Sequence, residues 1–585
     1  MRMRQMREFG LAALVLMLAA LGPLPAQASA FRLLLADGYE VVGTITGFED
    51  GLYSVVTSSG ARQLRLDAVK TIEPVTTTAS IDPGTRPDQK GVYAPAPEFT
   101  FATTTSKLVV GRLISFEDGV YQLQTRSGTV RLSVDEIRRV DVAWVERPPP
   151  PESSGKPLRA GTIRIAGSDA MAMLHIPPLV EAYSASGGGR DPLWSRGAKT
   201  DTRTFSVSAA KGKLTVTVRN TGSGAAAEAL LRGETDLALM SRRMLPEEAK
   251  RVQERGLGNP LGVGQEHELA PGGAVILVHP SNPVKALRHS QIADILAGRI
   301  RSWGDVGGTP RRIQVHALEE GSGTLDVVRA KLMGADELVG TIKRVASNAE
   351  MSDIVASDQA AIGIAEYAFA GNAVPLALID DCGRSIGPDE FSLQTREYFL
   401  STPLYLYVSS KATPETIAFL QFALSSPGQR ALTHAGLASY LPIAAPRAPI
   451  EPDRFAGWPR ASALIANELA RFMTRSARIS VAIGFSSNGS ALDPGSEREI
   501  SRLAAHMAEQ TAGKSVVLFG HSDATGNLRT GIRLSERGAQ LVEQKLRERA
   551  VPVERVFGLG PLLPISCDRT PEARARNYRV EAWIH

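Results

Sequence analysis

Two proline-rich stretches divide this chain of 585 residues into parts that cannot share one continuous core. The first contains four consecutive prolines, Pro148 to Pro151, which lack backbone donors and favour an extended polyproline II spacer. The second contains five prolines between Pro442 and Pro459. A chain of this length also exceeds what a single hydrophobic core supports. The sequence therefore predicts a multidomain protein with linkers at 146–158 and 447–474.

The first thirty residues have the pattern of a secretory signal peptide. A basic start precedes the apolar run LAALVLMLAALG, and small residues follow around Ala26, Ala28 and Ala30. No later segment approaches eighteen uninterrupted apolar residues, and no cysteine follows the cleavage region to accept a lipid. We therefore expect residues 1–30 to be removed and the mature protein to be periplasmic.

The charge and the histidines argue against two kinds of partner. The formal net charge is +5, but Arg2, Arg4 and Arg7 belong to the predicted signal peptide, so the mature chain is only mildly basic and nucleic acid is not expected to bind. The nine histidines are scattered without metal-ligand spacing. Neither a metal site nor a cofactor is predicted.

Cys382 and Cys567 are the two cysteines of the chain, and they fall in segments assigned below to different domains. They do not form a disulfide framework. We interpret them as two separate thiols, with an interdomain disulfide in an oxidising periplasm as the alternative.

The N-terminal part contains an internal repeat. The segment beginning at Val41 matches the one beginning at Val109, so that Phe48 to Gly51 corresponds to Phe116 to Gly119 and Tyr53 to Tyr121. Each copy alternates short apolar stretches with Asp-Gly and Ser-Gly turn signals, which is typical of antiparallel hairpins. The pattern predicts two small β-modules, at 31–75 and 107–145, that serve for docking or as spacers.

The central segment, 159–446, has the pattern of an α/β domain. Short apolar strands at Ile163–Ala166, Leu214–Val218, Ala274–Val278 and Ile313–Val315 alternate with helical patterns. This alternation predicts mainly parallel sheets, and the length suffices for two lobes with a cleft between them.

The run from Ile295 to Gly308, the loop Gly321-Ser322-Gly323-Thr324 and the strand Ala361–Ile364 give this segment a family resemblance. It resembles the phosphate-binding PstS group of periplasmic binding proteins. Four places combine small residues with hydroxyl or cationic groups beside a helix start: Gly167–Asp169, Gly222–Gly224, Ser241-Arg242 and Gly321–Thr324. Backbone amides at helix starts and adjacent hydroxyls are suited to binding an anion.

The resemblance implies an anion site built from these loops. Its predicted members are Ser168, Ser223, Ser241, Arg242, Glu320, Gly321, Ser322, Gly323 and Thr324. Glu320 stands where phosphate binders place an aspartate that accepts the proton of the ligand. Leu318 and Ala170 depart from the family, which commonly has an arginine and a threonine there, and Arg242 is expected to restore the positive charge. Phosphate is the expected ligand, with another oxyanion or no ligand as alternatives.

The C-terminal segment, 475–585, has a βαβαβ pattern. Strands are expected at Val481–Phe485, Val516–Gly520 and Tyr578–Ile584, with helices from Ser496 to Glu509 and up to Ala550. The apolar face of the first helix carries Ile500, Leu503 and Met507.

The motif from Gly520 to Gly526, the run Leu534–Ala539 and the final Asn577–Glu581 make this segment resemble the OmpA C-terminal family. The resemblance implies that Asp523 and an arginine grip the charged ends of diaminopimelate in peptidoglycan. Gly538 occupies the position of the family's second arginine, and Gly531 replaces a common asparagine. Arg537, or Arg533, is therefore the expected cation.

Together these features predict a non-catalytic protein, since no nucleophile, base and orienting group can be picked out by motif. The leading hypothesis is a periplasmic receptor for phosphate or a related oxyanion, associated with the cell wall and outer membrane through peptidoglycan. A transporter or sensor of the envelope is the expected protein partner. The alternative is an envelope scaffold whose two pockets have degenerated into docking surfaces.

Overall fold

The structure of the chain is a computed structural model. It describes ten strands between residues 31 and 143, and then residues 158–196, 202–209, 212–262, 264–445, 463–510, 514–524, 526–567 and 569–584. The predicted signal peptide, nearly all of the first predicted linker and much of the second lie outside these described residues. The chain divides into two compact units, 1–147 and 148–585.

The N-terminal unit is built on one antiparallel sheet of ten strands. The last strand of each repeat pairs with the long strand of the other: β10 (Ile137–Ala143) with β2 (Glu40–Glu49), and β5 (Val69–Pro74) with β7 (Leu108–Glu117). The remaining strands are β1 (Phe31–Leu35), β3 (Leu52–Thr57), β4 (Gly60–Arg65), β6 (Glu98–Thr103), β8 (Val120–Thr125) and β9 (Gly128–Ser133). The buried hydroxyls of Tyr53 and Tyr121, at equivalent positions, hydrogen-bond to each other. The repeats are β-modules as predicted, but they complete one shared sheet.

The first lobe of the second unit contains a mixed sheet. Its strand order is β12 (Arg190–Arg196), β13 (Thr202–Ala209), β14 (Gly212–Asn220), β11 (Gly161–Gly167), β15 (Leu237–Met240) and β24 (Ser401–Val408). Strand β11 runs parallel to β14 and β15, whereas the outer pairs are antiparallel. The sheet is therefore less parallel than the alternating sequence pattern predicted.

Helices cover both faces of this sheet because side chains of a strand alternate between its faces. Leu237 and Leu239 of β15 pack in the core that includes α2 (Ile176–Ser186), α9 (Pro414–Leu424) and α10 (Ser426–His434). Ala238 and Met240 pack in the core that includes α3 (Ser223–Leu231) and α4 (Pro246–Glu254). A π-helical turn, η3 (Met171–His175), precedes α2.

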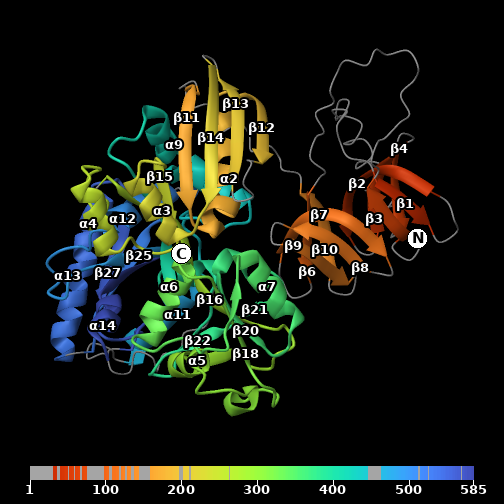
Figure 1. The fold of residues 1–585 in the computed structure, drawn as a ribbon. Helices are drawn as coiled ribbons and strands as arrows, with labels where there is room; N and C mark the ends of the chain where they lie inside the picture. The colour runs from red at the N-terminus through yellow and green to blue at the C-terminus, as the bar shows by residue number, and fades with distance from the viewer. Residues whose placement is uncertain are drawn as a thin grey trace, which may run out of the picture. The chain divides into compact units, whose positions relative to one another are not determined.

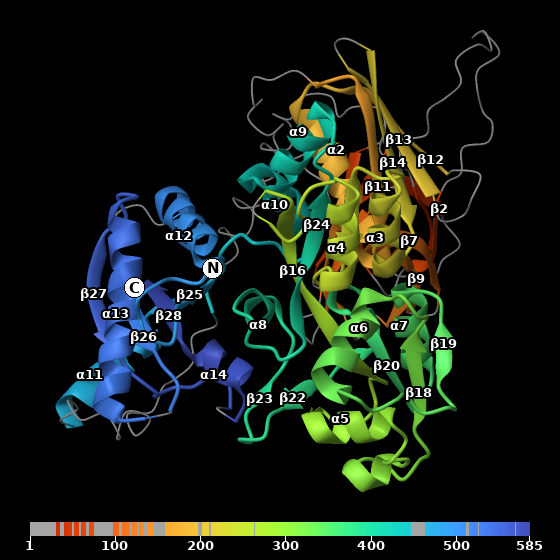
Figure 2. The ribbon, with the colours of Figure 1, turned by 60° about the vertical axis from the view of Figure 1, so that its left-hand side comes forward.

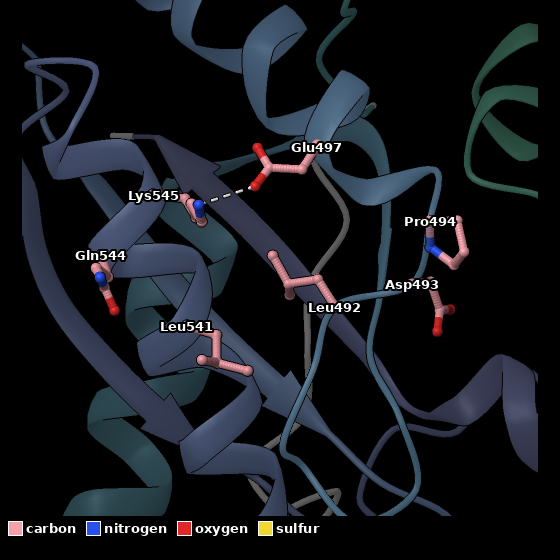
Figure 3. Close-up of a pocket in the computed structure, with 7 residues that line it drawn as sticks. All are labelled: Leu492, Asp493, Pro494, Glu497, Leu541, Gln544 and Lys545. Atoms are coloured by element: carbon pink, nitrogen blue, oxygen red, sulfur yellow. Dashed lines mark ion pairs between the residues drawn. The ribbon is translucent and has the colours of Figure 1, made fainter. Parts of the chain in front are cut away.

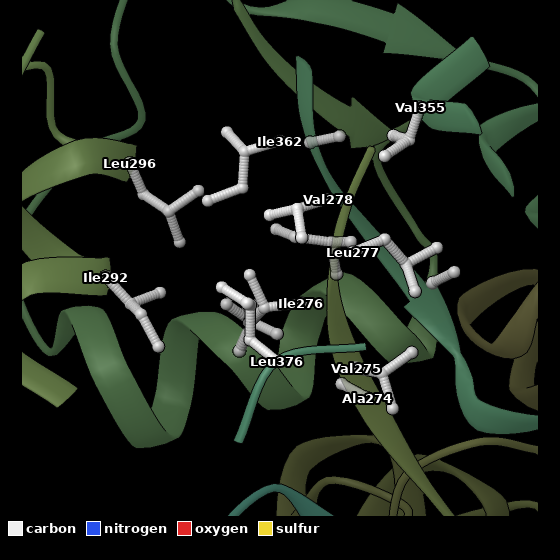
Figure 4. Close-up of a cluster of buried hydrophobic side chains, with 14 of the residues drawn as sticks. Ala274, Val275, Ile276, Leu277, Val278, Ile292, Leu296, Val355, Ile362 and Leu376 are labelled. Atoms are coloured by element: carbon white, nitrogen blue, oxygen red, sulfur yellow. The ribbon is translucent and has the colours of Figure 1, made fainter. Parts of the chain in front are cut away.

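The second lobe surrounds the strand order β16 (Glu266–Val278), β20 (Ala361–Glu366), β18 (Gln314–Leu318) and β19 (Lys343–Val345), with β21 (Val374–Pro375) on β16. Figure 1 shows α5 (His289–Leu296), α6 (Gly323–Val328) and α7 (Asn348–Ser357) grouped around these strands. Side chains such as Ile276, Leu296 and Ile362 point toward one another in its core (Figure 4). Shorter elements complete the lobe: β17 (Ala286–Arg288), η4 (Trp303–Val306), η5 (Arg329–Met333), η6 (Tyr367–Phe369), β22 (Ala377–Ile379), β23 (Ser385–Ile386) and α8 (Glu390–Gln394).

Strand β16 connects the two lobes. Its first part, Glu266–Gly273, pairs with β24, and its second part, Ala274–Val278, pairs with β20. Pro271, Gly272 and Gly273 stand where the strand passes from one lobe to the other. One long strand therefore carries the chain across the predicted two-lobed architecture.

The C-terminal domain contains a sheet in the order β25 (Ala477–Gly484), β28 (Arg579–Ile584), β26 (Val516–His521) and β27 (Val553–Gly558). Figure 2 shows α13 (Leu528–Arg547) along β26 and β27. Ile500, Leu503 and Met507 of α12 (Ser496–Gln510) are buried in its core, as the sequence predicted. Strand β27 and helix α14 (Pro571–Asn577) are additions to the expected pattern.

The helix α11 (Ala463–Arg475) lies in the stretch that the sequence indicated as linker. Its Leu469 and Met473 pack with Val517 and Phe519 of β26, while Val516 and Leu518 pack in the core that contains α12. Because alternate residues of a strand point to opposite faces, α11 covers the face of the sheet opposite α12. This helix belongs to the C-terminal domain.

A disulfide joins Cys382 of the second lobe to Cys567 of the C-terminal domain, with the Cα atoms 5.7 Å apart. The interpretation of two separate thiols is therefore wrong, because the fold brings together two residues 185 positions apart. Both ends are held by local hydrogen bonds: Asp380 accepts one from the Cys382 amide at 2.9 Å, and the Asn577 side chain accepts one from the Ser566 amide at 3.1 Å.

Further contacts join the C-terminal domain to the rest of the second unit. An ion pair places Arg478 of β25 2.6 Å from a Glu397 carboxylate oxygen, and Arg576 donates a hydrogen bond to the Glu397 backbone carbonyl at 2.8 Å. On the first lobe, the Arg502 guanidinium stacks on the Tyr440 ring at 3.7 Å. The C-terminal domain thus contacts both lobes.

Among the described residues, none of the helices is both long and apolar enough to span a membrane. The same residues contain no group of three or more His, Cys, Asp or Glu side chains arranged to hold a metal ion.

Candidate functional sites

Three buried serines come together at one edge of the first lobe. Ser168 follows β11, Ser223 begins α3 after β14, and Ser241 follows β15. These three strands are parallel neighbours, so their carboxyl ends lie at the same edge, which is the usual ligand-binding edge of an α/β sheet. The Ser168 and Ser241 hydroxyls are 2.5 Å apart, and the Ser241 amide donates to the Ser223 hydroxyl at 3.1 Å.

The glycine-rich loop of the second lobe faces this serine group. The Gly224 amide donates to the Gly321 carbonyl at 3.3 Å. A Cβ added to Gly323 would lie 2.4 Å from the Ser223 hydroxyl oxygen, so glycine is needed for this close approach. Thr324 is buried beside it at the start of α6, where Ser322 is the N-cap and accepts from the Leu325 amide at 3.5 Å. The two lobes therefore meet at the predicted loops.

Arg242 is buried, and most of its guanidinium N–H groups donate to carboxylates. It donates to both carboxylate oxygens of Glu248, at 2.7 and 2.8 Å, and to Asp326 at 2.8 Å. A fourth hydrogen bond reaches the Arg243 carbonyl at 3.1 Å. Because a guanidinium has five N–H donors, one of them is left for a ligand. The sequence analysis missed both carboxylate partners, although Asp326 follows the predicted loop by two residues.

Glu320 lies outside the buried serine group. Its side chain is 59% exposed and pairs with Arg329 and Arg344, each at 2.5 Å. The hydrogen bond from Arg329, assisted by Arg344, lowers the pKa of Glu320 and keeps it ionised. Leu318, where the family has an arginine, is buried in the apolar core of the second lobe.

A pair of carboxylates that the sequence analysis did not single out lies where the lobes meet. Asp169, next to Ser168, accepts from the Asn348 backbone amide at 3.0 Å and from its side-chain amide at 3.1 Å. The other Asp169 oxygen is buried without a hydrogen-bond partner among the described residues. The second carboxylate of the pair is Glu366. Burial raises the pKa of Asp169, and burial together with the nearby charge of Asp169 raises the pKa of Glu366 to about 7.

In the C-terminal domain, Asp523 follows β26 and is 5% exposed. The Tyr578 hydroxyl donates to one of its oxygens at 2.7 Å, and the Arg574 Nε lies 3.9 Å from the other. Arg537 is exposed on α13, and its Cβ approaches Gly489. No hydrogen bond or ion pair between Arg537 and Asp523 is found among the described contacts.

The two glycines that depart from the family have steric neighbours. A Cβ added to Gly538 would lie 2.6 Å from the ring of Phe485, which fills this side of α13. A Cβ added to Gly531 would lie 2.8 Å from the Ser522 hydroxyl oxygen. Side chains of this domain therefore occupy the space that a side chain at either position would enter.

A buried charge network lies on the neighbouring strands. Arg579 donates to Glu581 at 2.6 and 2.9 Å, and Arg478 lies 3.4 Å from the same carboxylate. Burial opposes ionisation of Glu581, but Arg478 and Arg579 hold its pKa well below the usual value. Burial lowers the pKa of His521, which keeps this adjacent ring neutral. Through Arg478 the network reaches Glu397 of the second lobe, so it bridges the C-terminal domain and this lobe.

A separate pocket of about 300 Å³ lies in the C-terminal domain (Figure 3). Its lining includes Leu492, Leu541 and the ion pair between Glu497 and Lys545, whose charged atoms are 3.1 Å apart. None of the predicted site residues lines this pocket.

Comparisons with known proteins match the two domains separately. Residues 198–427 match the PBP superfamily domain, and residues 484–578 match the OmpA family. This chain joins a PBP-like domain to an OmpA family domain. The PBP-like match includes Ser223, Ser241, Arg242 and the loop at 321–324, and the OmpA match includes Asp523.

Relatives of the PBP-like domain are phosphate-binding proteins. The phosphate-binding protein PstS of Staphylococcus epidermidis is 28% identical over 223 residues, which cover 36% of this chain and 66% of the relative. The PstS of Staphylococcus saprophyticus is 26% identical over 231 residues, covering 37% of this chain and 69% of the relative. A solved ABC-type phosphate transport receptor from Vibrio cholerae is 23% identical, with a TM-score of 0.35, and covers 47% of this chain and 98% of its own.

Proposed function

We propose that this protein is a periplasmic receptor for phosphate or a related oxyanion, held at the cell wall by its OmpA family domain. The observation that carries the proposal is the buried group of Ser168, Ser223 and Ser241, which faces the Gly321–Thr324 loop across the two lobes. Hydroxyls and backbone amides at the starts of α3 and α6 supply donors suited to an oxyanion. The PstS relatives bind phosphate by name, which supports the same ligand class.

The test is calorimetric titration of the full protein with phosphate, arsenate and sulfate at fixed ionic strength. We expect phosphate and arsenate to release heat. Ser223→Ala removes a hydroxyl donor and is expected to weaken phosphate binding by about ten-fold or more, because a hydrogen bond to a charged group contributes about 1.5–3 kcal/mol. The exposed Ser410 of the same domain provides the matched control, Ser410→Ala.

Within this proposal, Asp169 is a better acceptor for the ligand's proton than Glu320. Asp169 adjoins Ser168, and one of its oxygens is buried without a partner among the described residues, whereas Glu320 is bound by two arginines. Sulfate carries no proton at neutral pH, so a buried carboxylate disfavours it. We expect Asp169→Asn to reduce discrimination between phosphate and sulfate, and Glu320→Gln to leave that ratio unchanged.

Attachment to the wall is the second part of the proposal. It is supported by the OmpA family match and by Asp523 at the end of β26. Cosedimentation of the full protein with peptidoglycan sacculi tests it, and loss of binding in Asp523→Asn is the expected result. An envelope transporter or sensor would receive the anion.

The second candidate is a docking scaffold. It is favoured by Arg242, whose charge is largely taken up by Glu248 and Asp326. It is also favoured by the direct contacts between the lobes, from Gly224 to Gly321 and from Asn348 to Asp169. Titrations that release no heat with any of the three oxyanions would support the scaffold over the receptor.

A further inference from the structure

We infer that Arg574 supplies the cation of the peptidoglycan site, paired with Asp523, in place of an arginine on α13. The inference rests on the proposed attachment to peptidoglycan, and it assigns the residue that recognises a carboxylate of the ligand.

Helix α13 is poorly placed to supply this cation. At Gly538, any side chain would meet the Phe485 ring within 2.6 Å at its first carbon. The next candidate, Arg537, is exposed and approaches the Gly489 turn instead. The alternative, Arg533, is exposed and donates to the Thr530 hydroxyl of its own helix at 3.4 Å. One residue along a helix rotates a side chain by about 100 degrees, so Arg537 cannot simply take over the direction of position 538.

Helix α14 brings a different arginine to Asp523. The Nε of Arg574 lies 3.9 Å from one carboxylate oxygen, and the Arg574 side chain is 33% exposed, so solvent and ligand reach it. The second carboxylate oxygen of Asp523 accepts a hydrogen bond from the Tyr578 hydroxyl at 2.7 Å. Tyr578 packs edge-on against Phe485, with ring centroids 5.7 Å apart. The ring that fills the space at Gly538 therefore packs against the tyrosine that hydrogen-bonds to Asp523.

Two neighbouring arginines bind groups other than Asp523. Arg576 donates to the backbone carbonyls of Arg396 and Glu397, both at 2.8 Å. Arg579 is buried and bound to Glu581. Arg574 thus combines proximity to Asp523 with solvent exposure, which a ligand-binding cation requires.

The pairing of a carboxylate with an adjacent guanidinium suits an amino-acid zwitterion, whose ammonium and carboxylate sit on one carbon. The side chain of diaminopimelate ends in such a zwitterion. Lysine has the ammonium but lacks this carboxylate. The assignment therefore predicts that Arg574 makes the protein prefer peptidoglycan that contains diaminopimelate over peptidoglycan that contains lysine at the same position.

The experiment measures binding of the full protein to both kinds of sacculi by cosedimentation. The wild type is expected to bind the diaminopimelate sacculi more tightly. Arg574→Gln is expected to weaken that binding by about ten-fold or more and to bring the two affinities together, because only the diaminopimelate contact is lost. Arg574→Lys is expected to retain part of the preference. Arg555→Gln, which removes an exposed arginine on β27, controls for the general attraction of positive charge to the wall.

Each outcome discriminates. If Asp523→Asn abolishes binding but Arg574→Gln keeps the preference, the assignment to Arg574 is wrong while attachment to the wall stands. If Arg537→Gln removes the preference instead, the cation is on α13. If the wild type binds neither kind of sacculus, the proposed attachment fails, and the inference fails with it. Thermal denaturation of each variant identifies loss of fold. If Arg574→Gln does not fold, the sacculus preference of Arg574→Lys is compared with that of the wild type instead.

Discussion

The Cys382–Cys567 disulfide should stabilise the second unit by fastening the OmpA family domain to the second lobe. The perturbation is the double substitution Cys382→Ser and Cys567→Ser, which avoids leaving a single reactive thiol. The bridge closes a loop of 185 residues, and the chain-entropy relation gives a stabilisation of about 5 kcal/mol for a loop of this length. The ion pair between Arg478 and Glu397 and the hydrogen bonds of Arg576 remain in the variant, so the folded structure is expected to persist.

The assay is guanidinium denaturation of the purified protein with and without a reductant. The double variant should unfold at lower denaturant concentration than the wild type, with a loss of up to about 5 kcal/mol in the free energy of unfolding. Reductant should bring the wild type to the behaviour of the variant and leave the variant unchanged. Peptide mapping without reduction should recover the linked peptides. The reasoning is refuted if the oxidised wild type and the variant unfold at the same denaturant concentration.

Three further substitutions test the packing and the buried charges. Glu366 has a pKa of about 7 in the folded state, so the folded protein holds a proton that the unfolded chain releases above its ordinary pKa of 4.5. Stability should therefore fall as pH rises from about 4.5 to 7, by up to about 3 kcal/mol, and Glu366→Gln should flatten this dependence in thermal melts across that range. Gly538→Ala should destabilise the protein by about 1–3 kcal/mol, although alanine has a better helix propensity than glycine, because the new methyl group meets the Phe485 ring. An unchanged melting temperature would contradict the close packing of Phe485 on Gly538. Arg478→Met should cost about 1–3 kcal/mol in chemical denaturation, because the buried Glu581 then keeps only Arg579 and the half-buried Glu397 loses its ion pair. A loss below 0.5 kcal/mol, about the effect of an ordinary surface substitution, would contradict this.

Local patterns in the sequence predicted several elements of the fold. The repeat beginning at Val41 and Val109 predicts the N-terminal β-modules, and the apolar face of Ile500, Leu503 and Met507 predicts the buried side of α12. Such periodicities arise from the geometry of a single element, so they are readable without a structure. Pairing between elements is not readable in this way, which is why the sheet shared by the two repeats and the helix α11 were not anticipated.

In the candidate sites, too, the sequence indicated which loops are involved but not which side chains contact one another. The sequence order of the glycine and serine loops identified the residues that meet around Ser223. It did not reveal that Arg242 is held by Asp326 of the other lobe, 84 residues away, or that Glu320 is paired with Arg329 and Arg344. Spacing along the chain fixes which loop a residue occupies, whereas its direction and partners depend on residues that approach from other elements.

In the sequence by itself, motifs that resemble two known families indicated the kinds of domain and their order. Short-range patterns of apolar, small and turn-forming residues indicated many of their elements and the loops that carry their polar groups. Only the tertiary structure decided that Cys382 bonds to Cys567, that Phe485 fills the space beside Gly538, and that Arg574 lies opposite Asp523. Those contacts join residues far apart in the chain. Their formation depends on how whole helices and strands pack, which no local pattern encodes.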